Sequence, residues 1–301
     1  MLTEYIQISD ADLWTMNTLL VDLFVAIILL TGLRFISGLV ANVHTKTELA
    51  ERDNFAFGLS FSGGMIALAL MMTGVVSGEA HDNLITEGLM VALYGAVGLL
   101  LIKVGRFIQD KLVMTSIPIQ EEIKKGNLAA AFLDMAGTIA TGFVLRSVFI
   151  WVENETVVGL VIVLVAFILT QLLLALVTKF RLVVYEKRHP DGCLQEALKA
   201  GNVALSLRYF GHVVGVSLVM TAASSFIIYN SQHLGLALLT WVVVTIVFAS
   251  LLSFIASLAR HVILAGIDVV EEVDHQENVA IGAIEAAIYV SVATMILAVF
   301  S

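Results

Sequence analysis

The chain has 301 residues, of which 59% are hydrophobic and only 14% are charged, and its mean hydropathy is +0.97. A soluble domain carries about 25% charged residues, so this composition excludes a soluble protein and indicates an integral membrane protein. The formal net charge of -9 gives no support to a nucleic-acid partner, and the single cysteine excludes an internal disulfide and a multi-cysteine metal site.

Eight apolar stretches are each long enough to cross a bilayer as a helix, which needs roughly 20 residues for about 30 Å of hydrocarbon. Membrane strands are excluded because they alternate polar and apolar residues over about ten positions, whereas these stretches are apolar all round. The predicted fold is therefore all-α, a polytopic membrane bundle. The predicted spans are residues 13–33, 55–77, 86–105, 128–151, 157–178, 203–229, 234–259 and 279–300.

The basic residues are distributed unevenly between the two sides of the membrane. All Lys and Arg residues except Arg146 and Arg208 lie at the ends of odd-numbered spans or in the connections that follow them. The short connections on the opposite side contain no Lys or Arg, and two of them carry acids, namely Glu79, Asp82, Glu153 and Glu155. The positive-inside rule therefore places the long connections in the cytoplasm and predicts that both termini are periplasmic.

The pattern E-x-x-x-x-x-N-x-A occurs four times, each time where a cytoplasmic connection enters an even-numbered span. Its glutamates are Glu48, Glu121, Glu196 and Glu272, and its asparagines are Asn54, Asn127, Asn202 and Asn278. This recurrence indicates internal duplication. The repeating unit is an odd-numbered helix, a connection and an even-numbered helix, so we expect four hairpins in two parallel halves, residues 1–153 and 154–301.

The motif of an acidic residue, a short polar helix and N-x-A opening a span rich in small residues, repeated in pairs, resembles the bacterial inner-membrane family known as domain of unknown function 350. The resemblance covers roughly residues 13 to 301. Small members of that family look like two such hairpins, so the chain looks like two members fused. The resemblance implies a location in the bacterial inner membrane and this architecture, and it brings no established activity.

Each motif asparagine stands at the start of a span, and Asn is among the best N-cap residues. Because Ser, Thr and Asp also cap well, the same choice in all four copies predicts that the amide N–H donors are used too. The glutamate six residues earlier is expected on a short helix at the cytoplasmic surface, as a solvated charge.

Seven residues after each asparagine, on the same face of the helix, an aromatic residue alternates with an acid. The four residues are Phe61, Asp134, Tyr209 and Glu285. A carboxylate near the centre of a membrane helix costs roughly 2.5–3.5 kcal/mol on insertion scales, so we expect Asp134 and Glu285 to face a common interior.

Three further polar residues lie at membrane depth and complete a candidate polar or ion site with the two acids. They are Asp22, Arg208 and His212. Three acids against one arginine leave an excess of negative charge, which favours a cation or proton over an anion.

The sequence contains no motif for catalysis or for a cofactor. It has no H-E-x-x-H, no CxxC, no Walker loop and no G-x-G-x-x-G. We therefore predict a protein that is not an enzyme, with no catalytic residue, cofactor or metal site.

Three functions remain open from the sequence. The first is a small-cation or proton pathway between the two halves, with Asp134 and Glu285 as titrating groups. The second is a membrane scaffold or regulatory subunit that binds a cytoplasmic protein partner, and the third is binding of a lipid or hydrophobic ligand between hairpins. A homo-oligomer in the lipid bilayer is compatible with each. A water-accessible cavity that reaches both acids would favour the first, and a dry, tightly packed interior the second.

Overall fold

The computed structural model describes residues 10–41, 43–78, 81–152, 157–188 and 194–300. Among these residues the chain is helical and contains no strand, and eight helices are long and apolar enough to cross a membrane, which confirms the all-α membrane bundle. The expected boundary between the halves lies outside the described residues. The long helices are α1 (Asp10–Ala41), α2 (Phe55–Val75), α3 (Leu84–Ile108), α5 (Leu128–Trp151), α6 (Val157–Arg188), α8 (Val203–Ser224), α9 (Leu234–Ile263) and α10 (Val279–Phe300).

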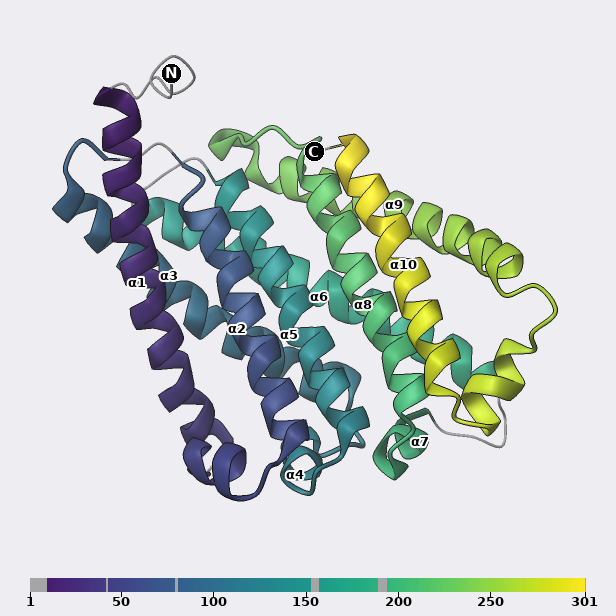
Figure 1. Cartoon of the computed structure of the whole chain (residues 1–301). Coiled ribbons are helices and arrows are strands. Elements are labelled where there is room, and N and C mark those ends of the chain that lie inside the picture. The colour runs from purple at the N-terminus through teal and green to yellow at the C-terminus, as the bar shows by residue number, and fades with distance from the viewer. Residues whose placement is uncertain (1–9, 42, 79–80, 153–156, 189–193, 301) are drawn as a thin grey trace, which may run out of the picture.

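Short helical elements lie between the long ones. Five of them follow odd-numbered spans and gather at one end of the bundle, which we call the motif end because the four repeats of the motif lie there (Figure 1). They are η2 (Thr47–Glu51), η3 (Gln109–Val113), α4 (Ile119–Lys124), α7 (Leu194–Ala200) and η5 (Glu271–His275), while η4 (Ser231–His233) lies at the opposite end.

The helix bounds differ from the predicted spans in two ways. The odd-numbered spans continue as helix beyond their apolar windows, because the charged residues at their ends are good helix formers that a hydropathy window rejects. In contrast, α8 ends at Ser224 rather than at residue 229. The apolar residues that follow leave the helix, and the Ile227 carbonyl accepts a hydrogen bond from Trp151 Nε1 at 2.8 Å.

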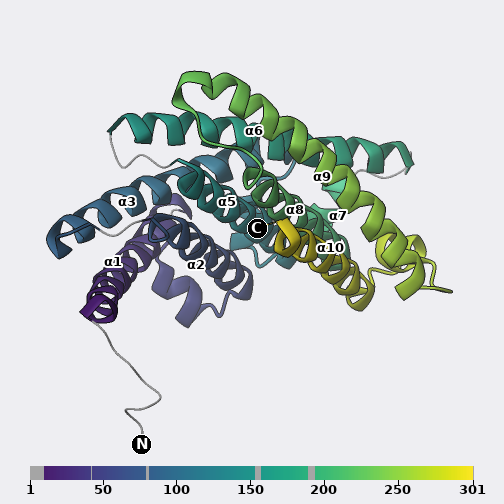
Figure 2. The same ribbon diagram turned by 90° about the horizontal axis from the view of Figure 1, so that it is seen from above.

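The even-numbered spans α2, α5, α8 and α10 stand side by side in chain order, and we call them the row helices. Behind the row lie α3, α6 and α9, while α1 stands at one end beside α2 (Figures 1 and 2). Burial follows position in the row: 78% of the apolar window of α5 and 72% of that of α8 is buried, against 50% for α2 and 33% for α10. The two middle row helices are therefore the most buried, and α10 lies at an exposed end of the row.

Glycines bring neighbouring row helices into close contact. A Cβ atom at Gly211 of α8 would overlap Ala286 of α10, and one at Gly63 of α2 would overlap Met135 of α5. Gly211 and Gly63 each lie nine residues after their motif asparagine. The two halves therefore use the same close approach, as small residues allow in membrane helices.

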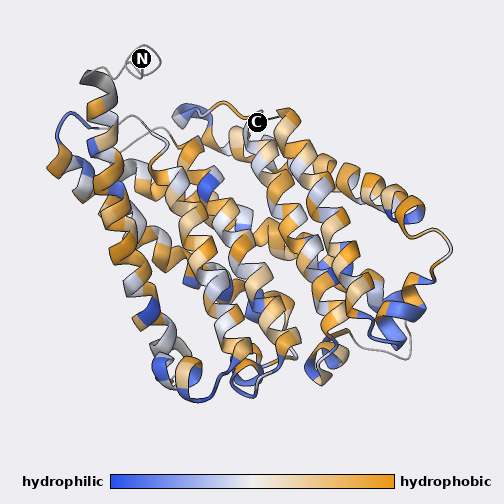
Figure 3. Ribbon diagram, in the orientation of Figure 1, coloured by the Kyte–Doolittle hydropathy of each residue, from blue (hydrophilic) through white to orange (hydrophobic). Residues whose placement is uncertain are grey.

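The hydropathy of the surface agrees with a membrane location. Apolar residues dominate the middle of the bundle, and the most hydrophilic segments gather at its two ends, above all in the connections of the motif end (Figure 3). Large exposed apolar side chains on α1 and α9, such as Phe24 and Phe254, suit contact with lipid tails.

Candidate functional site

All four motif asparagines cap the row helices. The Oδ1 atom of Asn54 accepts a hydrogen bond from Phe57 N at 3.1 Å, and the other three accept from the backbone three residues later in the same way. The residue before each asparagine has a positive φ. These residues are Asp53 (48°), Gly126 (87°), Gly201 (105°) and Glu277 (54°).

The amide donors of three asparagines reach the next repeat, and we call these contacts the asparagine ladder. They join Asn54 Nδ2 to Ile123 O at 3.1 Å, Asn127 Nδ2 to Lys199 O at 3.0 Å, and Asn202 Nδ2 to Val273 O at 3.2 Å. Each acceptor lies in the short helix of the motif end, so the ladder ties the start of one row helix to the connection before the next. An Asp side chain would cap equally well and could not donate.

The motif glutamates divide into two groups. Glu48 accepts from Asn54 Nδ2 at 3.0 Å and Glu272 accepts from Asn278 Nδ2 at 2.7 Å, so neither is the solvated charge that the sequence predicted. Glu121 and Glu196 are exposed, as predicted. The difference arises from the type of helical turn before the asparagine. Elements η2 and η5 are π-helical and hold one more residue per turn than the α-helical α4 and α7. A glutamate six residues before the asparagine therefore points toward it in the first and last repeats and away from it in the two middle repeats.

Asp134 lies at the centre of a first buried cluster. Arg106 from α3 donates to both of its carboxylate oxygens, and Ser60 Oγ from α2 donates to Oδ2 at 2.5 Å. Gln120 Nε2, from α4, is 3.4 Å from Oδ1. Asp134 is only 3% exposed, so these side chains replace the water that a carboxylate would otherwise bind.

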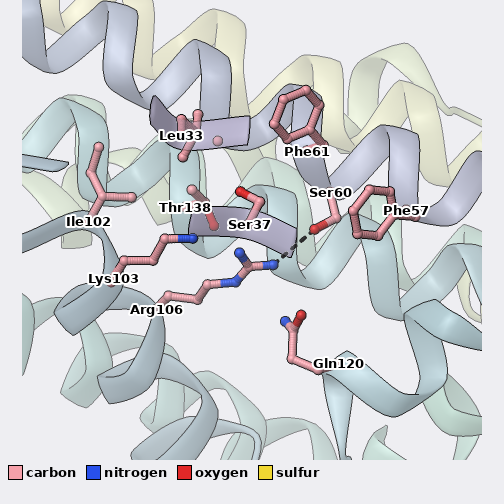
Figure 4. A pocket seen from close by; sticks show the side chains of 11 residues that line it. Leu33, Ser37, Phe57, Ser60, Phe61, Ile102, Lys103, Arg106, Gln120 and Thr138 are labelled. Atoms are coloured by element: carbon pink, nitrogen blue, oxygen red, sulfur yellow. Dashed lines mark hydrogen bonds between the residues drawn. The ribbon is translucent and has the colours of Figure 1, made fainter. Parts of the chain in front are cut away.

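Little space remains beside this cluster. A cavity between α1, α2, α3 and α5 has about 10 Å³ open to the centre of a water molecule, which is about the minimum for one water. Figure 4 shows Arg106 pointing toward Ser60, with Lys103 reaching into the same space. The cavity beside the first cluster therefore has room for about one water molecule.

Glu285 lies at the centre of a second buried cluster and is 1% exposed. Arg208 Nε from α8 donates to its Oε2 at 2.5 Å, and Arg260 Nη1 from α9 donates to Oε1 at 3.2 Å. The same Arg208 donates from Nη1 to Asp274 of η5 at 3.0 Å, and Asp274 also accepts from Tyr185 at 3.2 Å. Arg208, one of the candidate residues named from the sequence, is thus paired with Glu285.

The two clusters are built on one plan. Ser60 and Arg208 each lie six residues after their motif asparagine, and each contacts the acid on the next row helix. An arginine near the motif end of the odd-numbered span before the acid completes each cluster: Arg106 in the first and Arg260 in the second. This shared arrangement is what a duplication of one half of the chain would produce.

The charge count expected from the sequence was wrong. Arg106 and Arg260 were assigned to the ends of spans, and their long side chains instead reach back to the acids. Lys103 and Asp110 interact electrostatically with the first cluster, and Asp274 belongs to the second. Each of the two acids therefore has at least one arginine partner, so the single arginine counted from the sequence understates the positive charge around them.

Of the remaining candidate residues, His212 lies beside the second cluster, near Arg208 and Arg260, and Asp22 lies apart from both acids. The His212 ring packs on Tyr289 with centroids 3.8 Å apart, and Arg181 covers the same tyrosine at 5.2 Å. Asp22 of α1 lines a separate cavity at the end opposite the motif end, beside Glu87. Asp134 takes its partners from the first half and Glu285 takes its partners from the second, so the structure does not bring the two acids into one site.

Sequence reasoning missed Arg106, Arg260 and Ser60 as members of these clusters. Ser60 carried a usable signal, because it occupies the same repeat position as Arg208. The two arginines carried none, because the connections between them and the next asparagine differ in length.

Comparison with known proteins gives one family. The model of the family described as Domain of Unknown Function (DUF350) matches residues 11–149, 83–183 and 150–300. No curated protein and no solved structure matches the chain. The first and last of the three matches divide the chain within the last turn of α5.

Proposed function

The chain belongs to the DUF350 family, and we propose on the geometry of this member that it is a membrane scaffold, whose row helices hold the cytoplasmic connections in fixed register for a soluble protein partner. The observation that carries the proposal is the asparagine ladder, which links the start of each of α2, α5 and α8 to the short helix of the following repeat. A rigid, repeated surface at one face of the membrane is what a scaffold requires.

The charge clusters support the same proposal. A titrating group in an ion pathway must exchange its partner for a proton, a cation or water during each cycle. Asp134 and Glu285 are each bound by a guanidinium and by further side-chain donors, and these partners hold each buried carboxylate in place. These contacts are suited to specifying how the helices pack.

Reconstitution separates a scaffold from an ion pathway. The protein would be placed in liposomes at defined orientation, and fluxes of protons, Na⁺ and K⁺ would be followed with fluorescent dyes. We expect fluxes equal to those of protein-free liposomes. A flux above that level that is lost in Glu285→Gln, in a variant shown by thermal unfolding to be folded, would refute the scaffold proposal.

One observation favours the cation pathway as a second candidate. A cavity of about 770 Å³ opens between α1, α2, α3 and α5 at the end opposite the motif end, and its lining includes Asp22, Asp82 and Glu87. An Oδ1 atom of Asp22 is buried without a hydrogen-bond partner among the described residues. Under this candidate, Asp22→Asn would reduce a measured cation flux, whereas under the scaffold proposal no flux exists to reduce.

A further inference from the structure

The junction between the two halves of the chain is a head-to-tail contact between α5 of the first half and α8 of the second. Phe132 and Phe210 meet there edge to face with ring centroids 6.5 Å apart, and Thr221 Oγ1 donates to Phe143 O at 3.4 Å. Asn127 adds one step of the asparagine ladder to the same junction. The contact is specific, because each side supplies different residues.

Because the halves are duplicated, the surfaces that correspond to the two sides of this junction also occur on α10 and on α2, at the two ends of the row. There no other row helix in the described part of the chain covers them. The face of α10 that corresponds to the junction face of α5 carries Ala283 and Thr294, at the positions of Phe132 and Phe143. The face of α2 that corresponds to that of α8 carries Ser62 and Thr73, at the positions of Phe210 and Thr221. All four of these residues are exposed.

The last step of the ladder is also incomplete. Asn54 donates both to its own Glu48 and to the following repeat, whereas Asn278 donates to its own Glu272 and contacts no following repeat among the described residues. The carbonyls that would receive it by analogy belong to Leu49 and Ala50 in η2. Both residues are exposed.

We propose that a second copy of this chain docks its α2 edge on the α10 edge, so that the contact between copies repeats the α5–α8 junction within the chain. The inference does not depend on whether the protein is a scaffold or a pathway. The first helix of the second half, α6, already lies across α5 and η3 of the first half. Its counterpart α1 has only 17% of its apolar window buried, so it has a free face for a neighbouring copy.

This contact is heterologous, and its symmetry follows from the membrane. All four repeats place their motif at the same end of the bundle. The axis of the rotation that relates one half to the next is therefore parallel to the membrane normal. Repetition of that rotation gives a closed ring when it divides a full turn and an extended row when it does not.

Cysteine cross-linking in native membranes tests the proposal. The background is Cys193→Ser, which removes the only native cysteine. Ala283→Cys and Ser62→Cys are introduced singly and together, and a short bismaleimide is added before solubilisation. We expect the double variant to give cross-linked dimers and larger species on denaturing gels, and each single variant to remain monomeric. Coexpression of the two single variants should also give dimers.

Two controls calibrate this experiment. Phe132→Cys with Phe210→Cys repeats the same positions at the internal junction, so its cross-link within one chain shows that the protein is folded and that the reagent spans the gap. Ala283→Cys with Ser250→Cys pairs the α10 edge with an exposed position on α9 and should not link copies.

Two outcomes would overturn the proposal. If the internal pair links and the Ala283/Ser62 pair does not, the edges do not meet a second copy. If Ala283→Cys alone gives dimers, two α10 edges meet in an isologous contact instead of the head-to-tail contact.

Discussion

At the scale of single residues, the two acids within the membrane are explained by their partners. Arg208 bridges Glu285 and Asp274 and also donates to Val269 O at 3.2 Å. One side chain therefore connects α10, η5 and the segment before it. Burial of each charge is offset by charge-assisted hydrogen bonds, and removal of one partner leaves the other charge buried and unpaired.

Glu285→Gln should therefore destabilise the protein. The glutamine side chain keeps the shape of the glutamate and removes its charge, so Arg208 and Arg260 lose their ion-pair partner in the interior. Breaking a buried ion pair in this way costs about 3–5 kcal/mol. Thermal unfolding in detergent should show a clear fall in Tm. The isosteric control Asp82→Asn, at an exposed acid, should leave Tm unchanged, and an equal Tm for Glu285→Gln and wild type would contradict this account.

A smaller loss is expected for Ser60→Ala. Ser60 donates to Asp134 and accepts from Arg106 Nη2 at 2.9 Å, while the carboxylate keeps its arginine. A hydrogen bond to a charged group contributes about 1.5–3 kcal/mol. The same unfolding assay should place Ser60→Ala between wild type and Glu285→Gln, and a loss larger than that of Glu285→Gln would show that the hydroxyl, not the ion pair, dominates.

At the scale of elements, the row helices are held together by close backbone approach and at their starts by the asparagine ladder. Gly282 of α10 faces the backbone of Ala204 in α8, and Gly142 of α5 faces that of Ala67 in α2. Neither glycine has space for a Cβ atom. The helices cannot move apart without loss of these contacts, because packing is a main source of association between helices in lipid.

Gly211→Ala should separate α8 from α10. Its new Cβ would overlap the backbone of Ala286, and overpacking of this kind costs typically 1–3 kcal/mol. Gly235→Ala is the matched control, because a Cβ there meets nothing within 4 Å and Ala favours the helix. The first variant should lower Tm and the second should keep or raise it. If both variants behave alike, close approach at Gly211 is not important for stability.

Asn54→Asp tests the ladder directly. Asp keeps the cap of α2, loses the donor to Ile123 O and places a second carboxylate beside Glu48. We expect faster amide hydrogen exchange in α4, measured by mass spectrometry. Asn83→Asp is the control, since Asn83 caps α3 through Ile85 N at 2.8 Å and is not part of the ladder. Unchanged exchange in α4 would mean that the ladder does not hold it.

At the scale of the whole molecule, the four hairpins share one orientation, with their motif connections at the same end. Inverted repeats, which many secondary transporters use for alternating access, are therefore absent from the described part of the chain. The parallel arrangement makes the two edges of the row complementary to one another. The internal repeat therefore shapes the fold and also gives the chain two edges that could bind each other in neighbouring copies.

The orientation in the membrane is predicted from the basic residues. Reporters at Asp82 and after Ser301 should report a periplasmic location, and a reporter near Pro190, which lies outside the described residues, should report a cytoplasmic one, because positive charge near a span is retained in the cytoplasm. Paired fusions with alkaline phosphatase and green fluorescent protein provide the measurement. A periplasmic signal at Pro190 would reverse the orientation.

The sequence by itself determined the class of fold, the eight long apolar helices, the repeated motif and the family. These properties depend on composition, on windows of about 20 apolar residues and on a recurring motif, all of which act along the chain. It also located Asp134 and Glu285 at the same depth in each half, since both lie seven residues after a helix cap whose position is local.

Only the tertiary structure decided which groups surround those acids. Arg106 and Arg260 have flexible side chains at the ends of helices, and whether such a side chain turns to water or back toward a buried carboxylate depends on which helix packs beside it. The order α2, α5, α8, α10 separates the acids into two clusters and leaves α10 at an edge. Contacts between segments far apart in the chain set that order, so hydropathy and spacing along the chain could not determine it.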